Sequence, residues 1–128
     1  MERNYQTRFL NPVAFQSISD KATGDDLELI EEIVKNCAEY VKDVDVGEAQ
    51  IKRFYATLEG EELRERVAAV DQRRRIRHNE AITSCKMLNR LASMYDTDNV
   101  FTGDDTDRLQ IADFCLDVTV TIFQNRKR

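Results

Sequence analysis

The sequence predicts an all-α protein, a helical bundle of four main helices plus a short N-terminal helix. Two observations predict this fold class. Apolar residues recur at spacings of three and four along most of the chain, which is the period of an α-helix. The 128 residues include only one proline and four glycines, fewer than the frequent turns of an all-β protein require. We expect residues 1–128 to form a single helical domain, because this length suits one hydrophobic core.

The chain begins with a segment that is expected to precede the first helix. Residues 1–10 hold Tyr5, Phe9 and Leu10 among polar residues, and we expect them to form an N-terminal arm that packs on the body. Asn-Pro at positions 11–12 is a typical helix start, because asparagine caps the backbone and proline fits the first turn. The sequence therefore predicts a short helix directly after this arm.

Two further helices are expected between Gly24 and Gly60. Residues 26–45 carry an apolar stripe on one side and many glutamates and lysines on the other, as in a half-buried helix. Gly47 is expected to break this helix, because glycine is a poor helix former. The next helix is expected over residues 48–58, where apolar residues again recur with the helical period.

The longest predicted helix covers about residues 61–95 and forms the centre of the bundle. An acidic loop, residues 96–107, follows it. The last helix, about residues 105–124, is apolar around most of its circumference, so we expect it to be deeply buried or shared with a second subunit. A strand is the competing prediction for residues 118–122, where β-branched residues alternate with period two.

Polar residues interrupt the apolar stripe of the long helix at its middle. Arg74 and His78 occupy positions where core residues are expected, with Asp71 and Arg75 beside them. His78 is the only histidine of the chain. Asp71 and Arg75 are four residues apart with the acid first, the favourable order for an ion pair on a helix. The stripe consists of Leu63, Val67, Val70, Arg74, His78, Ala81, Cys85, Leu88, Ala92 and Tyr95.

Two interpretations of this polar cluster are open. In the first, the cluster is a buried polar network that fixes how the long helix packs against another helix. In the second, Asp71, Arg74, Arg75 and His78 form a pocket for a small anionic ligand, with arginine as the charge partner and His78 as a proton donor. The candidate network partners in the helix over residues 26–45 are Glu31, Glu32, Glu39 and Tyr40.

The spacing of the candidate ligands argues against a metal site, and no cofactor is expected. Metal sites in helical bundles place a glutamate three residues before a histidine, but Arg75 stands there before His78. Asp71 is roughly 10 Å from His78 along the helix axis, too far to share one ion. The arginine-rich run at 73–77 splays around the helix and suits a salt-bridged helix face. Together with the net charge of −5, this arrangement of the arginines argues against nucleic acid as a partner.

The cysteines and the hydropathy pattern indicate the cellular compartment in which the protein is expected. Cys37, Cys85 and Cys115 fall on apolar helix faces and lack metal-like spacing, so we expect buried, reduced thiols in a cytoplasmic protein. No stretch approaches about 18 consecutive apolar residues, so no membrane-spanning helix is expected. The N-terminal segment lacks the apolar region of a signal peptide, and none is expected.

These patterns favour a small helical interaction or regulatory protein without chemistry of its own. A last helix that is apolar on most sides predicts an exposed patch of the kind that marks interfaces, so we expect a homodimer formed through the last helix or the long helix, or another protein as the partner. The alternative is a ligand-binding or enzymatic bundle with an anionic-ligand pocket at Arg74 and His78. The alternative requires a cleft with His78 at its wall, whereas the interaction protein requires an exposed apolar surface.

Overall fold

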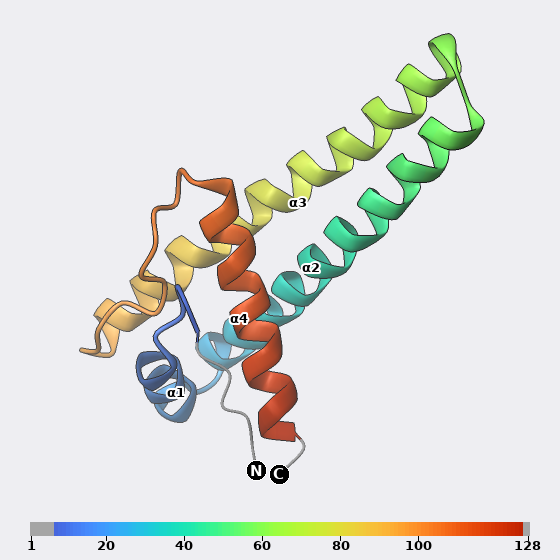
Figure 1. Ribbon diagram of the computed structural model, residues 1–128. Coiled ribbons are helices and arrows are strands. Elements are labelled where there is room, and N and C mark those ends of the chain that lie inside the picture. Colours follow the sequence, from blue (N-terminus) through green and yellow to red (C-terminus); the bar gives the residue numbers. More distant parts are fainter. Residues whose placement is uncertain (1–6, 127–128) are drawn as a thin grey trace.

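The computed structural model describes residues 7–126, with side chains up to residue 122, and it is all-α as predicted. Among the described residues there is no strand, and an isolated bridge joins Leu10 to Phe101. Residues 118–122 are helical, so the competing prediction of a strand there is wrong. The helices are α1 (Pro12–Lys21), α2 (Asp25–Thr57), α3 (Gly60–Met94) and α4 (Arg108–Arg126) (Figure 1).

Local signals in the sequence explain where the helices begin. The side chain of Asn11 accepts a hydrogen bond from the backbone N–H of Ala14 at 3.1 Å, and Pro12 lies in the first turn of α1, as predicted. α3 begins at Gly60, whose φ of +67° lies in the left-handed region that glycine adopts without strain. The long helix predicted over residues 61–95 is therefore confirmed within one residue at each end.

The predicted helix break at Gly47 is wrong. The two helices predicted over residues 26–45 and 48–58 are one continuous helix, α2, of 33 residues. Gly47 is buried against α3, and a Cβ atom added to it would lie 3.2 Å from both Val70 Cγ1 and Arg74 Nε. The missing side chain lets α2 and α3 approach closely, and this contact offsets the weak helix propensity of glycine, which is about 1 kcal/mol.

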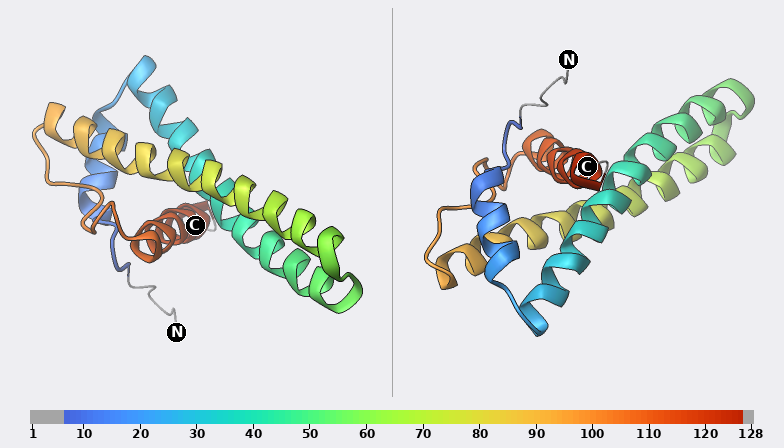
Figure 2. Two further views of the ribbon diagram at one scale, coloured as in Figure 1. Left: turned by 90° about the horizontal axis from the view of Figure 1, so that it is seen from above. Right: turned by 90° about the horizontal axis from the view of Figure 1, so that it is seen from below.

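α2 and α3 form a long antiparallel hairpin whose two helices are joined by residues 58–59 (Figures 1 and 2). α1, α4 and the segment between α3 and α4 gather around the end where α2 begins and α3 ends, and there the two long helices diverge (Figure 2). We call this part the body. The other end projects from the body as two helices alone, and we call residues 44–77 the outer hairpin.

The hydrophobic core lies in the body, where α2, α3 and α4 meet. α4 buries one of its sides there: Ile111, Phe114 and Val118 are fully buried. Its opposite side is open, with Leu109 76% exposed and Leu116 40% exposed. The expectation of a deeply buried last helix is therefore met on one side only.

Two polar side chains tie the loops to this core. Asp117 of α4 is 1% exposed and accepts hydrogen bonds from the backbone N–H groups of Arg8 and Phe9 at 2.9 and 3.0 Å. Asn89 of α3 holds the acidic loop through the backbone of Val100 and Phe101, whose N–H groups donate to its side-chain oxygen at 2.8 Å. The described part of the N-terminal arm, residues 7–10, therefore packs on the body, as expected, whereas Tyr5 lies outside the described residues.

The thiols of α2, α3 and α4 meet in the core. Cys37, Cys85 and Cys115 are free and at most 1% exposed. A hydrogen bond with Cys37, together with burial, raises the pKa of the Cys115 thiol well above its usual range, and burial raises the pKa of Cys85 in the same way. A thiol that stays protonated and buried is a poor nucleophile.

We expect all three native thiols to react slowly with an aromatic disulfide reagent at pH 8, and rapidly once the protein is unfolded in guanidinium. Absorbance of the released thiolate gives both rates. The control is Ser93→Cys, which adds a fourth cysteine at an exposed position of α3 and is expected to react at once. Fast labelling of the native wild type would contradict the buried positions of the cysteines.

Gly47→Leu is expected to lower the free energy of unfolding by about 1–3 kcal/mol, because the added side chain forces α2 away from α3. Gly47→Ala is the matched variant, and it is expected to stay within about 1 kcal/mol of the wild type because improved helix propensity offsets the tight contact. Urea unfolding followed by circular dichroism measures both. A Gly47→Leu protein as stable as the wild type would contradict the close approach of the two helices.

Candidate functional site

The structure divides the predicted polar cluster of α3 between the hairpin seam and the surface. Arg74 Nη1 lies 3.8 Å from Asp71 Oδ1, and these side chains are 25% and 48% exposed. Arg75 is exposed and forms no ion pair with any described residue, so the predicted pair with Asp71 is made by Arg74 instead. Because the pair of Asp71 and Arg74 is partly exposed, breaking it does not cost the several kcal/mol of stability that breaking a buried ion pair costs.

His78 contacts α2 at Tyr40, one of the partners that the sequence predicted. The Tyr40 hydroxyl and His78 Nδ1 are 3.5 Å apart, a long hydrogen bond, and the ring centroids are 6.3 Å apart. Burial lowers the pKa of His78, and the charge of Arg108 lowers it further. The imidazole is therefore neutral at pH 7, so it adds no positive charge to this region.

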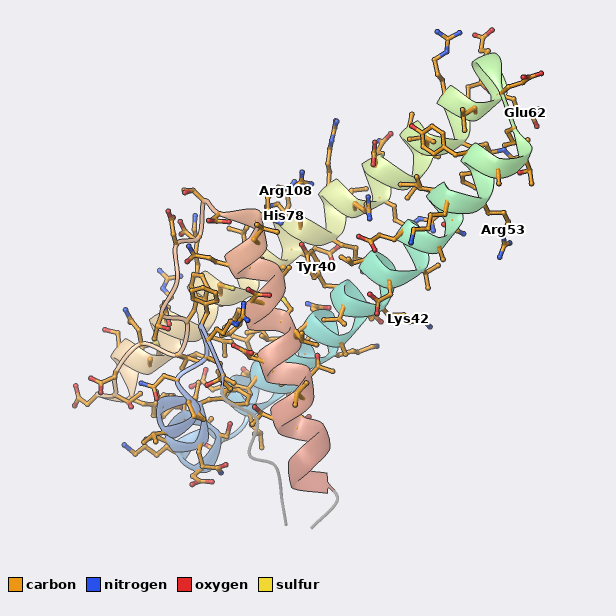
Figure 3. All side chains as sticks on the ribbon, viewed as in Figure 1. Tyr40, Lys42, Arg53, Glu62, His78 and Arg108 are labelled. Atoms are coloured by element: carbon orange, nitrogen blue, oxygen red, sulfur yellow. The ribbon has the colours of Figure 1, made fainter. Side chains whose placement is uncertain are left out.

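A hollow of about 270 Å³ lies where α4 begins against the α2–α3 hairpin. Figure 3 shows Tyr40, His78 and Arg108 close to this junction, with Arg53 and Glu62 farther out on the hairpin. His78 does not line the hollow, but its partner Tyr40 does. Its lining includes three arginines and one aspartate, and among these arginines Arg74 and Arg77 have acidic partners. The lining residues are Tyr40, Asp43, Val44, Arg74, Arg77, Arg108, Leu109 and Ala112.

Arg77 lines this hollow and has three acidic partners. Its Nε donates to Asp43 Oδ2 at 2.7 Å, and its Nη1 lies 3.3 Å from Glu39 and 3.2 Å from Glu80. The hydrogen bonds with Asp43 and Glu80 raise the pKa of Arg77. Arg77 thus joins α2 to α3 as a structural ion pair, which fits the salt-bridged helix face that the arginine-rich run suggested.

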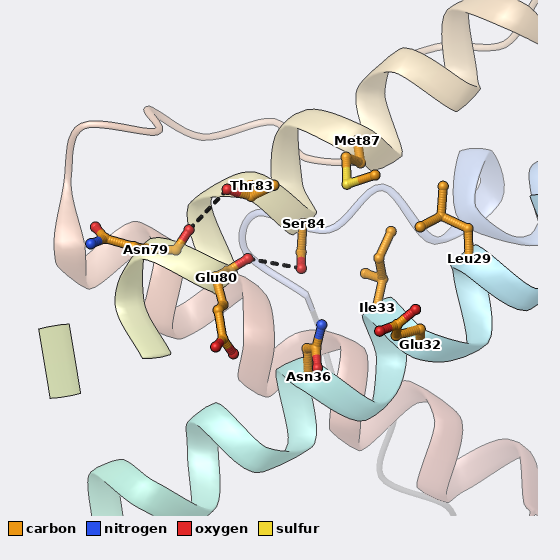
Figure 4. A pocket seen from close by; sticks show the side chains of 9 residues that line it. All are labelled: Leu29, Glu32, Ile33, Asn36, Asn79, Glu80, Thr83, Ser84 and Met87. Atoms are coloured by element: carbon orange, nitrogen blue, oxygen red, sulfur yellow. Dashed lines mark hydrogen bonds between the residues drawn. The ribbon is translucent and has the colours of Figure 1, made fainter. Parts of the chain in front are cut away.

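A second hollow, of about 380 Å³, lies between α2 and α3 and receives no residue from α4. Figure 4 shows Leu29, Ile33 and Met87 beside it. The hydroxyls in its wall are occupied within α3: Thr83 donates to the backbone oxygen of Asn79, and Ser84 donates to that of Glu80. Its charged lining residues are Glu32 and Glu80. This acidic hollow does not coincide with the predicted anion site.

Sequence reasoning missed Arg108, because a loop separates α4 from α3 and nothing in the local sequence places the first residue of α4 beside Arg74.

The model of a family described as "Protein of unknown function (DUF3232)" matches residues 3–128. The chain belongs to this family. No curated protein and no solved structure matches it. The function of this DUF3232 member must therefore be argued from its own geometry.

The described residues of this DUF3232 protein show neither a metal-binding cluster nor a membrane-spanning helix. Within the described residues, no three histidine, cysteine, aspartate or glutamate side chains gather where they would hold a metal ion. None of the four described helices combines the length and the hydropathy that crossing a membrane requires. The arginine-lined hollow at the base of the outer hairpin and the hairpin itself remain as the candidate functional features.

We expect the pKa of His78 to lie below 6.5, and Arg108→Gln to raise it toward that value by removing a like charge. Because His78 is the only histidine, its imidazole C–H signals in NMR report this pKa without overlap. The unfolded chain binds more protons just below pH 6.5, so the contribution of His78 to stability falls as the pH drops through this range. Lys42→Gln is the charge-matched control, and a wild-type pKa above 6.5 would contradict the prediction.

Proposed function

We propose that this protein is a helical interaction protein without chemistry of its own, which self-associates through its outer hairpin. The observation that carries the proposal is the incomplete burial of the hairpin seam. From residue 48 to residue 69 no residue is buried, although apolar side chains line the seam between α2 and α3. The partly exposed seam residues are Ile51, Phe54, Leu58, Leu63 and Val67.

Two helices alone cannot surround an apolar seam, because each helix covers only one side of the other. In the body a third helix, α4, completes the burial, and the seam residues Ile33, Cys37 and Leu88 are at most 2% exposed. In the outer hairpin no described segment takes this place. Further apolar side chains stand open there, with Val46 42%, Tyr55 65% and Ile76 54% exposed. A surface of this kind marks an interface.

The accessible surface of the protein supports the same conclusion. It measures 8873 Å² for a chain of 14.9 kDa. A compact monomer of this mass exposes roughly 7,000 Å², so the excess is roughly 1,900 Å². A standard protein interface buries only about 800 Å² on each partner. The extended shape therefore offers more than enough surface for a stable dimer.

The charges of the outer hairpin favour a second copy as the occupant. Residues 59–62, at the turn, include three glutamates, with Arg64 and Arg66 following on α3, whereas Arg73 and Arg75 stand exposed at the hairpin base beside Asp71. These regions are about 14 residues apart on α3, which is roughly 21 Å. When two outer hairpins pack antiparallel about a two-fold axis, the acidic turn of each faces the basic base of the other, and both contacts form at once. The resulting four-helix unit covers both seams.

The free cysteines bear on where this association takes place. Cys37, Cys85 and Cys115 are all unoxidised thiols. Thiols of this kind persist in a reducing compartment, which supports the cytoplasm as the location.

We expect light scattering to give about twice the 14.9 kDa mass of one chain, and Tyr55→Glu to give the monomer because it places a charge in the interface. Tyr55 is 65% exposed, so the variant is expected to keep the helical circular dichroism of the wild type. Val13→Glu is the matched control, because Val13 is 78% exposed on α1 of the body, and it is expected to stay dimeric.

A charge exchange tests the antiparallel arrangement separately. Glu61→Lys with Glu62→Lys is expected to weaken the dimer, and adding Arg73→Glu with Arg75→Glu to the same chain is expected to restore it. A wild type that stays monomeric up to millimolar concentration would refute self-association. Dimers that ignore the charge exchange would refute the antiparallel arrangement.

A further inference from the structure

We propose that the hollow between Arg74 and Arg108 binds a small organic anion, a carboxylate carried on a short apolar body. The site lies where α4 begins against the hairpin, and it requires only one chain. It therefore needs no second copy to form, although Val44, Arg74 and Arg77 of its wall also belong to the outer hairpin. It extends the anion pocket considered at Arg74 and His78 by a second arginine from α4 and by an apolar wall.

The charge available to a ligand comes from two guanidinium groups. Arg108 is exposed, and its guanidinium group forms no ion pair or side-chain hydrogen bond with another described residue. Arg74 is held only by Asp71, at 3.8 Å and at a half-exposed carboxylate. Arg77 is already saturated by acids and contributes little. Guanidinium forks bind carboxylates through paired, charge-assisted hydrogen bonds.

Arg74 and Arg108 both act on Tyr40 in the wall of the hollow. Burial raises the pKa of Tyr40, while the charges of Arg108 and Arg74 both oppose this shift. The Tyr40 hydroxyl therefore lies within the field of both guanidinium groups. An anion placed beside this hydroxyl is attracted by both guanidinium groups, and the hydroxyl can donate a hydrogen bond to it.

The opposite wall of the hollow is apolar and selects an organic ligand. Val44 of α2 and Leu109 and Ala112 of α4 contribute it, and Leu109 is 76% exposed. A ligand with an apolar body covers this wall and removes it from water. Inorganic phosphate has no apolar body to cover the wall, and it loses its own hydration when it enters the hollow. The volume of about 270 Å³ lies just below the range of roughly 300–1,000 Å³ for drug-sized ligands, so the ligand is small.

Benzoate is a suitable probe, because it joins one carboxylate to one apolar ring. It is titrated into the monomeric Tyr55→Glu protein and into the wild type, and the His78 imidazole signals and the backbone amide signals are followed by NMR. We expect saturable shifts in both proteins at Tyr40, Arg108 and Leu109. We also expect the pKa of His78 to rise on binding, since the anion offsets the charge of Arg108.

The variants separate a specific site from general attraction of anions. Arg108→Gln and Arg74→Gln are each expected to weaken benzoate binding by about tenfold or more, the effect of losing one charge-assisted contact. Lys42→Gln and Arg53→Gln remove the same charge from exposed positions outside the hollow and are expected to leave the affinity unchanged. Thermal melts of the four variants establish that each is folded.

Several results would overturn the proposal. Shifts that do not saturate, or that persist unchanged in Arg108→Gln, would remove the site. Phosphate that binds as tightly as benzoate would remove the role of the apolar wall. Binding in the monomeric variant but not in the wild type would show that the acidic turn of a second copy, rather than a small molecule, occupies the hollow in the dimer.

Discussion

The close contact of α2 with α3 at Gly47 is the constraint on which the rest of the structure depends. A side chain at this position would meet Val70 and Arg74 of α3 at 3.2 Å. Because none is present, both helices continue past this point without a break and remain in contact up to their turn.

The second constraint is the unequal length of the helices. α2 and α3 have 33 and 35 residues, whereas α4 has 19. At about 1.5 Å per residue, α4 is some 20 Å shorter than its neighbours and covers only the body. Where α4 covers the seam, its apolar side chains are buried. Beyond α4, the apolar side chains of the seam are partly exposed. The excess surface and the open seam therefore have one cause, which is the missing third helix in the outer hairpin.

The helices were predictable because each carries an apolar stripe whose helical period can be recognised from the sequence alone. The continuity of α2 was not predictable, because the weak propensity of glycine is a local property and the contact that overrides it lies on another helix. Asp117 and Arg108 were missed for a related reason. Asp117 bonds to the backbone of Arg8, 109 residues away. Of the predicted site residues, Arg74 lines the hollow beside α4, whereas Arg75 lies at the surface.

The polar break in the stripe of α3 now has a physical explanation. Arg74 and His78 lie at the level where α4 begins, between the covered seam of the body and the open seam of the outer hairpin. Ala81 and Cys85, farther into the body, are buried at 2% and 0% exposure. At this level the Arg74 side chain is 25% exposed, so a polar residue keeps part of its hydration there. The same boundary leaves a hollow beside Arg108, because the end of a helix cannot fill the space that its next turn would occupy. A polar interruption in a long apolar stripe thus marks the level at which a third helix ends, and both candidate functional features of this protein begin there.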